Sequence, residues 1–104
     1  MINRVVLMGR ICSDLELKHT TTGKAVTTFR LAVPRSYDKE KTDFIDIVAW
    51  EHNAEFICKT FTKGNLIAVE GSLMTRQYQA KDGSNRTVVE VRADNISFTG
   101  ERIE

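Results

Sequence analysis

The sequence contains few of the residues that mark several classes of protein. It has one proline, six glycines and two cysteines among 104 residues, and with 41% hydrophobic residues a wholly disordered chain does not fit. No apolar run approaches the roughly 18 residues of a membrane-spanning helix, and polar residues interrupt the N-terminus where a signal peptide would be apolar. Cys12 and Cys58 make no metal-binding spacing, which favours reduced thiols in a cytoplasmic protein.

Catalytic and cofactor-binding motifs are also missing. The sequence has no G-x-S-x-G, no P-loop and no G-x-G-x-x-G, and His19 and His52 belong to no cluster with metal-ligand spacing. Asp43 and Asp46 could form a carboxylate pair, but three positions apart on a strand they point to opposite faces. We therefore expect no enzyme, no cofactor and no metal. The alternative is a nuclease that uses these two aspartates with a metal ion.

The length predicts a single domain over residues 1–104, because domains cluster at roughly 100–150 residues. Five segments have the composition or the alternation of β-strands, and they cover 5–11, 25–33, 44–50, 66–76 and 86–98. Turn residues are expected to separate them at 22–23, 36–42 and 81–84. In the third segment Ile45, Ile47 and Ala49 form an aliphatic face, which predicts that Phe44 and Trp50 point outward.

One segment has helical spacing instead. Four residues fall at i, i+3, i+4 and i+7, on one stripe of a helix: Ala54, Ile57, Cys58 and Phe61. Asn53 is expected to cap the start of this helix and Gly64 to end it. The order β-β-β-α-β-β predicts an all-β fold with one helix. We interpret it as a five-stranded Greek-key barrel of the OB type, with the helix between strands 3 and 4.

Four aromatic residues occupy outward or loop positions rather than core positions. They are Tyr37, Phe44, Trp50 and Tyr78. Unpaired bases stack on such rings at about 1–3 kcal/mol each, without regard to base identity. The pattern therefore favours binding of single-stranded nucleic acid. The alternative is that Phe44 and Trp50 fill a subunit interface and that Tyr37 and Tyr78 are ordinary loop aromatics.

The net charge of +1 hides an uneven distribution of charge. Residues 17–37 contain four cations and no anion, and residues 71–92 contain four cations against two anions. Such segments can form a basic face on a protein whose charges sum to nearly zero. An ordinary mixed surface is the alternative that charge alone leaves open.

Several segments resemble one family in order and spacing. They are N-R-V-V-L-M-G-R (3–10), D-L-E-L-K-H-T-T-T-G-K-A-V (14–26), F-R-L-A-V (29–33), A-E-F (54–56), K-G-N-L (63–66), V-E-G-S-L-M-T-R (69–76) and the Asp-Gly hairpin followed by V-E-V (89–91). Together they are similar to the bacterial single-stranded-DNA-binding proteins, the SSB family, over essentially the whole chain.

The resemblance implies an OB-fold subunit that binds single-stranded DNA without sequence preference during replication, recombination and repair. It implies a homotetramer, with a dimer as the alternative, in the bacterial cytoplasm at the nucleoid, encoded by a bacterium or a phage. The family's stacking positions fall on the same four rings. Its phosphate-contacting positions fall on Arg4, Lys63, Arg76 and Arg86, and their placement in the sequence adds Lys18, Arg30 and Arg35.

The sequence also departs from the family pattern. Leu15 and His19 stand where the family has proline and tyrosine, and His52 and Gln77 replace two of its basic positions. Typical members continue into a flexible linker and an acidic tip that recruits replication and repair enzymes. We expect neither segment here, since residues 101–104 read E-R-I-E, and hence no partners recruited by a tail. An OB-type protein-interaction subunit, such as a primosomal accessory factor, is the remaining alternative.

Overall fold

The computed structural model describes residues 1–101 of the chain. Its elements follow in the order β1 (Val5–Ile11), β2 (Lys18–His19), β3 (Ala25–Arg35), β4 (Asp38–Trp50), α1 (His52–Thr60), β5 (Leu66–Gln79) and β6 (Asn85–Ser97). Five of the strands are long, and α1 lies between the third and the fourth of these. This confirms the predicted order of elements.

The strands form one sheet in the order β1-β5-β6-β4-β3-β2, and a further pairing of β1 with β3 closes it into a barrel. The pairing of β4 with β6 is parallel, and every other pairing among residues 1–101 is antiparallel. A closed barrel of five long strands with one helix is the predicted OB architecture. Closure leaves few free strand edges, which would otherwise invite aggregation.

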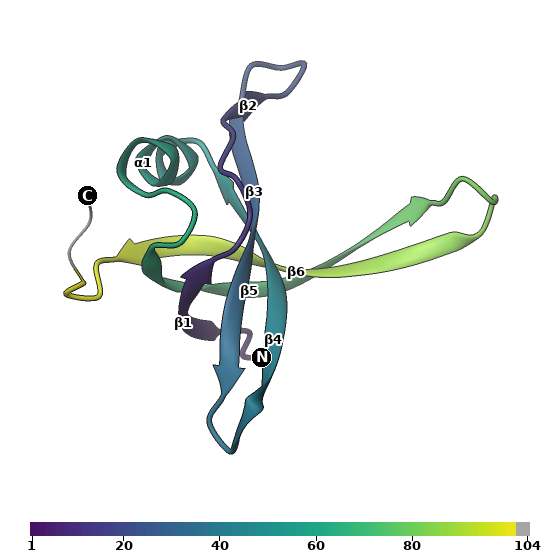
Figure 1. The fold of residues 1–104 in the computed structure, drawn as a ribbon. Coiled ribbons are helices and arrows are strands. Elements are labelled where there is room, and N and C mark those ends of the chain that lie inside the picture. The colour runs from purple at the N-terminus through teal and green to yellow at the C-terminus, as the bar shows by residue number, and fades with distance from the viewer. Residues whose placement is uncertain (102–104) are drawn as a thin grey trace.

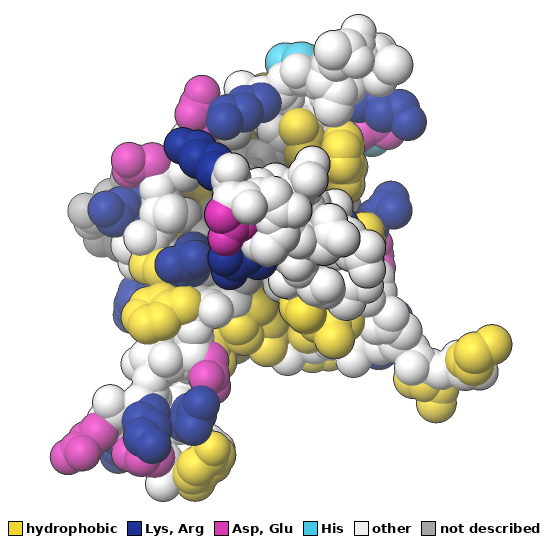
Figure 2. Space-filling view, turned by 90° about the vertical axis from the view of Figure 1, so that its right-hand side faces the viewer, with side chains coloured by type: hydrophobic (Ala, Val, Ile, Leu, Met, Phe, Trp, Pro, Cys, Tyr) yellow, Lys and Arg dark blue, Asp and Glu magenta, His cyan; other side chains and the backbone are white. Residues whose placement is uncertain are grey.

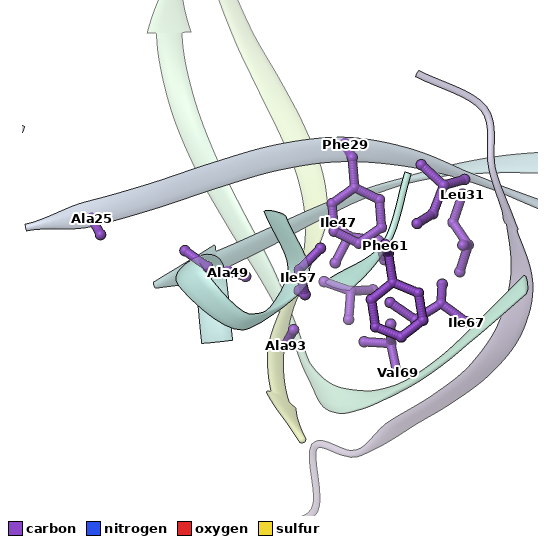
Figure 3. Close-up of a cluster of buried hydrophobic side chains, with 13 residues drawn as sticks. Ala25, Phe29, Leu31, Ile47, Ala49, Ile57, Phe61, Ile67, Val69 and Ala93 are labelled. Atoms are coloured by element: carbon purple, nitrogen blue, oxygen red, sulfur yellow. The ribbon is translucent and has the colours of Figure 1, made fainter. Parts of the chain in front are cut away.

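The core fills the barrel from all five long strands. Leu31, Ile47 and Ile67 are fully buried, and Phe29 and Phe61 pack with them (Figure 3). Ile57 brings the apolar stripe of α1 onto the same cluster. The aliphatic face of Ile45, Ile47 and Ala49, which the sequence predicts to point inward, therefore does face the barrel core.

Three hairpins extend beyond the barrel (Figure 1): the β2–β3 arm, the β3–β4 arm and the β5–β6 arm. The turn expected at 36–42 is wrong over most of its length, because β4 begins at Asp38 and continues the arm. A bulge at Pro34 and Arg35 shifts the register so that Arg35 pairs with Asp38. Charged residues exposed on both sides of a two-stranded arm leave no alternation to detect.

The ends of α1 differ from expectation. Glu51, not Asn53, is the N-cap residue, with a φ of 54° and no side-chain cap. The side chain of Asn53 instead donates to the carbonyl oxygens of Ala93 and Asp94 at 3.3 and 3.0 Å, which fastens α1 to β6.

Gly64 does not end the helix, because α1 stops at Thr60 and Phe61 is already extended. Gly64 has a φ of 98° and turns the chain towards β5, where its N–H donates to the carbonyl of Ile11 at 2.7 Å. A glycine suits this conformation because L side chains rarely adopt it.

Within residues 1–101, no helix is both long enough and apolar enough to cross a membrane.

Candidate nucleic-acid interface

One face of the barrel wall carries three of the four singled-out rings. Across the β3–β4 ladder Trp50 lies opposite Val26 and Phe44 lies opposite Ala32, so both rings are on the outer side of β4. The parallel pair of Val48 with Arg92 carries this outer side over to β6. From there the antiparallel ladder with β5 continues it to Tyr78. The register thus places Trp50, Phe44 and Tyr78 on one continuous surface.

That ladder also aligns the predicted cations with the rings. Arg86 lies opposite Tyr78 in the β5–β6 arm, and Arg30 lies opposite Asp46 beside Phe44. Arg76 is two positions before Tyr78 on β5, hence on the same side. Lys18 lies opposite Val26 and hence in the row of Trp50. Four of the seven cations named from sequence therefore share the surface with the three rings.

The rings are open to solvent to different degrees. Tyr37 at the tip of the β3–β4 arm is 81% exposed, Phe44 is 60% exposed and Tyr78 is 46% exposed. Trp50 is half-buried at the end of β4. None of the four is in the buried core, so each has a face or an edge that an incoming base can reach.

Trp50 lines a cavity of about 330 Å³ between the β2–β3 arm and the sheet, whose other lining residues are Thr20, Thr22, Lys24, Glu51 and Arg92. Lys24 and Arg92 are cations beside this ring that the sequence reasoning did not place in the site. Lys24 belongs to the cation-rich segment 17–37, which was the available signal. Arg92 belongs to the cation-rich segment 71–92, but the parallel β4–β6 pairing brings it to the ring, and no local pattern indicates that pairing.

Phe44 lines a second hollow of about 330 Å³. Its other walls are mostly aliphatic: Val5, Leu7, Ile45, Asp46, Leu73, Val89 and Val91. Leu73 and Val89 are exposed where β5 and β6 leave the barrel as an arm. An aromatic ring beside an apolar hollow suits the flat, weakly polar face of a base.

Two arginines on the surface are paired with carboxylates. Arg30 Nε lies 3.3 Å from Asp46 Oδ1, and Arg76 Nε lies 3.2 Å from Glu90 Oε1. Between them is a cavity of about 440 Å³, lined by Cys12, Ser13, Thr28, Phe29 and these four charged residues. Positive charge is therefore held at fixed points beside the rings.

Two more of the predicted cations, Arg35 and Arg86, lie on the arms. Arg35 donates to Asp43 and to the hydroxyl of Tyr37 at the β3–β4 arm, and its hydrogen bond holds the pKa of Asp43 below the usual 3.8. Arg86 donates to Ser84 and pairs with Asp82 at the end of the β5–β6 arm. Hydrogen bonds from Ser84 lower the pKa of Asp82.

Lys18 in β2 lies opposite Val26, which in turn lies opposite Trp50, so Lys18 shares the side of the sheet that carries this ring. Two predicted contacts lie away from the rings. Lys63 is in the turn between α1 and β5. Arg4 precedes β1 and pairs with Glu70 of β5. Figure 2 shows one side of the molecule, where Lys and Arg side chains gather around apolar patches above and below the β5–β6 arm that points at the viewer.

The two aspartates that a nuclease would need, Asp43 and Asp46, form ion pairs with different arginines. Asp43 pairs with Arg35 and Asp46 with Arg30, and their spacing on β4 puts them on opposite faces. Among residues 1–101 no three His, Cys, Asp or Glu residues lie together as a metal site.

Comparison with known proteins identifies related sequences. The model of the single-strand binding protein family matches residues 2–99. The chain is 50% identical to the single-stranded DNA-binding protein of Clostridium tetani over 101 residues, covering 93% of this chain and 70% of that protein. It is 46% identical to single-stranded DNA-binding protein 3 of Clostridium acetobutylicum, with the same coverage of both chains. It is 42% identical to single-stranded DNA-binding protein A of Bacillus subtilis, covering 94% of this chain and 59% of that protein.

Proposed function

The chain belongs to the single-strand binding protein family, and we propose that it binds single-stranded DNA without sequence preference. Bases stack on Trp50, Phe44 and Tyr78, and on Tyr37 where the strand reaches the β3–β4 arm. The observation that carries this proposal is the ladder register, which puts three of these rings on one outer surface of the barrel.

The surface favours single strands over duplex for a simple reason. Stacking on a protein ring needs the flat face of a base, and this face is covered by neighbouring bases in a duplex. Each stacked base contributes about 1–3 kcal/mol, and every base has such a face. Binding by this route is therefore indifferent to sequence.

The backbone of the strand is held by cations. Arg30, Arg76 and Arg86 lie among the rings, and Lys18 lies in the row of Trp50. Arg4, Arg35 and Lys63 extend the path over the arms and around the barrel. Each phosphate that they neutralise releases counterions, so affinity falls as salt rises. The log–log slope is roughly −0.7 per contact for a single strand.

The protein acts as a binder without turnover. A strand that lies on the rings cannot pair with its complement, and its backbone is shielded from nucleases. This suits replication, recombination and repair, in the cytoplasm at the nucleoid. Metal-dependent cleavage is the competing activity, and incubation of labelled oligonucleotide with Mg²⁺ separates the two, because a binder leaves the strand intact.

The chain has a single tryptophan, so its fluorescence reports on Trp50 alone. Titration with oligo-dT at low salt is expected to quench this fluorescence, and a matched duplex is expected to quench it far less. Quenching that weakens with the predicted salt slope supports the proposal. Unchanged fluorescence together with no gel shift at low salt would reject it.

The subunit is proposed to assemble into a homotetramer, with a dimer as the alternative. Val6 and Met8 are large apolar side chains on the outer side of β1, and both are exposed in the single chain. Met8 also lines an apolar hollow of about 260 Å³ with Ala32, Pro34 and Leu66. Light scattering during titration with poly-dT measures the subunit number and the bound strand together.

A further inference from the structure

Arg30 and Arg76 stand on opposite sides of the 440 Å³ cavity in the outer wall. Each is held by one carboxylate through the same atom. Nε of Arg30 contacts Asp46, and Nε of Arg76 contacts Glu90, at 3.3 and 3.2 Å. Neither Nη1 nor Nη2 of either arginine has a hydrogen-bond partner among residues 1–101.

This use of Nε determines what each guanidinium can still do. The group is a planar fork with five N–H donors. When a carboxylate occupies the Nε side, the two terminal nitrogens remain for a phosphate, which accepts two parallel hydrogen bonds from such a fork. Arg35 shows the contrast, because its Nε and Nη2 both donate to Asp43 and its Nη1 donates to Tyr37.

Glu90 is the more unusual of the two carboxylates. It is only 7% exposed, whereas the Arg76 side chain above it is 57% exposed. A carboxylate so little exposed is expensive unless it is paired, and Arg76 is the cation that pairs with it among residues 1–101. The buried end of the pair is thus fixed, and the exposed end points its free donors to solvent.

The two pairs lie side by side. Asp46 and Glu90 each come one position before the parallel pair of Ile47 with Val91, on neighbouring strands β4 and β6. Both face outward, as does Arg30 across the β3–β4 ladder. Four charges therefore follow one another across the outer surface that carries the rings. They are Arg30, Asp46, Glu90 and Arg76, on β3, β4, β6 and β5.

We propose that the cavity is a phosphodiester subsite of the single-stranded DNA surface, in which Asp46 and Glu90 are positioning residues for Arg30 and Arg76. The inference rests on the proposed function and extends it to two acidic residues. Each carboxylate holds its arginine in one orientation before the strand arrives, so less rotamer freedom is lost when a phosphate binds.

The sign of the effect distinguishes positioning from simple electrostatics. Acidic side chains in a surface that binds a polyanion repel it, so removing one should tighten binding if charge alone matters. If the carboxylate positions its arginine, truncating it should weaken binding even though a negative charge is lost.

The test compares truncation with neutral replacement at both positions. Glu90→Ala and Asp46→Ala each remove the carboxylate that accepts from Nε of the arginine. Each variant should weaken binding of oligo-dT about 2- to 10-fold, because the freed arginine side chain must then be ordered when the strand binds. The salt slope should shrink by up to about 0.7, the share of one phosphate contact. Glu90→Gln and Asp46→Asn keep an oxygen that accepts from Nε, and we expect both to bind at least as tightly as the unchanged protein.

Two further variants serve as controls. Glu55→Ala removes an exposed negative charge from α1, away from the cavity, and is expected to leave affinity unchanged or slightly tighter. In an Arg76→Ala background, Glu90→Ala should cause no further loss, because the arginine that it positions is gone. If Glu90→Ala fails to fold, Asp46→Ala carries the test, since the Asp46 side chain is 45% exposed.

Tighter or equal binding by folded Glu90→Ala and Asp46→Ala overturns the inference and leaves the proposed function intact. If Glu90→Ala weakens oligo-dT binding as much in the Arg76→Ala background as in the unchanged protein, the positioning role of Glu90 is also overturned. Absence of oligo-dT binding by the unchanged protein overturns both.

Discussion

Arg35 donates to the carboxylate of Asp43 from two nitrogens: the single N–H of Nε is shared between Oδ2 at 3.1 Å and Oδ1 at 3.3 Å, and Nη2 donates to Oδ1 at 2.9 Å. Its remaining terminal nitrogen donates to the hydroxyl of Tyr37 at 3.4 Å. A phosphate would have to compete with these partners for the guanidinium. Arg76 uses Nε alone and has no such competition at its terminal nitrogens within residues 1–101.

The difference predicts unequal roles in DNA binding. Arg76→Ala should weaken oligo-dT binding and reduce the magnitude of the salt slope by about 0.7. Arg35→Ala should change the slope by clearly less, since most of its donors already serve the β3–β4 arm. Fluorescence titrations of the two variants at several salt concentrations measure both quantities. Equal slopes for the two variants would contradict this ranking.

Phe44 and Phe98 form a matched pair for testing the stacking surface, because both are 60% exposed. Phe44 lies on the outer side of β4 with Trp50. Phe98 lies beyond the end of β6, where its ring centroid is 5.9 Å from that of Phe56 and 5.7 Å from that of Phe61. Phe44→Ala should cost about 1–3 kcal/mol of binding free energy to oligo-dT.

Phe98→Ala should leave DNA affinity nearly unchanged and lower the melting temperature instead, because it removes an edge-to-face aromatic contact with Phe56. Affinity and melting temperature are measured on both variants. The stacking role of Phe44 fails if its truncation alters affinity no more than that of Phe98.

The pairing of Arg10 with Glu101 predicts a pH dependence of stability. The two terminal nitrogens of Arg10 donate to the two carboxylate oxygens of Glu101, each at 2.9 Å. The hydrogen bond from Arg10 lowers the pKa of Glu101 below its usual 4.5. A carboxyl whose pKa is lower in the folded protein stabilises the fold above its unfolded value, and this contribution is lost as the pH falls through the folded value.

Glu101→Gln should therefore melt at a lower temperature than the unchanged protein at pH 7. The gap should stay constant down to about pH 5 and close as the pH drops further, because the native carboxylate then becomes protonated. Thermal unfolding of both proteins across this range measures the gap. A gap that persists unchanged at pH 2 would mean that the ion pair contributes nothing to it.

Much of the fold and part of the site follow from local patterns. The alternation in 44–50 correctly put Ile47 and Ala49 inside and Phe44 and Trp50 on the opposite side of the strand. Period-two patterning works here because β4 has one face in the barrel core. The roles of the rings and cations in binding DNA stay predictions.

The rest depends on long-range pairing, which the sequence does not display. Arg92 reaches the Trp50 cavity because β4 and β6 pair in parallel at Val48 and Arg92, positions 44 residues apart. The local sequence predicts Asn53 as a helix cap, yet its side-chain amide donates to the β6 carbonyls of Ala93 and Asp94. In both cases a tertiary contact overrides or adds to the local preference.

The exposed side chains of β1 predict the effect of a charge on assembly. Val6→Glu places a carboxylate on the outer side of β1, and burying it in a subunit interface without a partner is unfavourable. The variant should sediment or scatter as a smaller species than the unchanged protein. Leu17→Glu, an exposed apolar position before β2, is the control. An unchanged mass for Val6→Glu would place any interface elsewhere.

Gly71 has no room for a side chain, because an added Cβ would lie 1.7 Å from the carbonyl oxygen of Arg92. The register between β5 and β6 shifts at Glu70 and Gly71, and this bulge bends β5 from the barrel wall into the arm. Gly71→Ala should therefore destabilise the protein by about 1–3 kcal/mol or more, since backbone on both strands must move. Denaturant unfolding measures the loss.

Gly83 at the tip of the β5–β6 arm provides the comparison. It has a φ of 85° but open space around an added Cβ, so Gly83→Ala should cost only the strain of a left-handed alanine, roughly 1–2 kcal/mol. Because the tip lies far from the core, that strain can be relieved by local rearrangement of the turn, whereas the clash at Gly71 cannot. Gly71→Ala should also weaken oligo-dT binding, as it shifts the strand that carries Arg76 and Tyr78. If the two alanine variants were equally stable and bound oligo-dT equally well, the bulge would not be what sets the position of the arm.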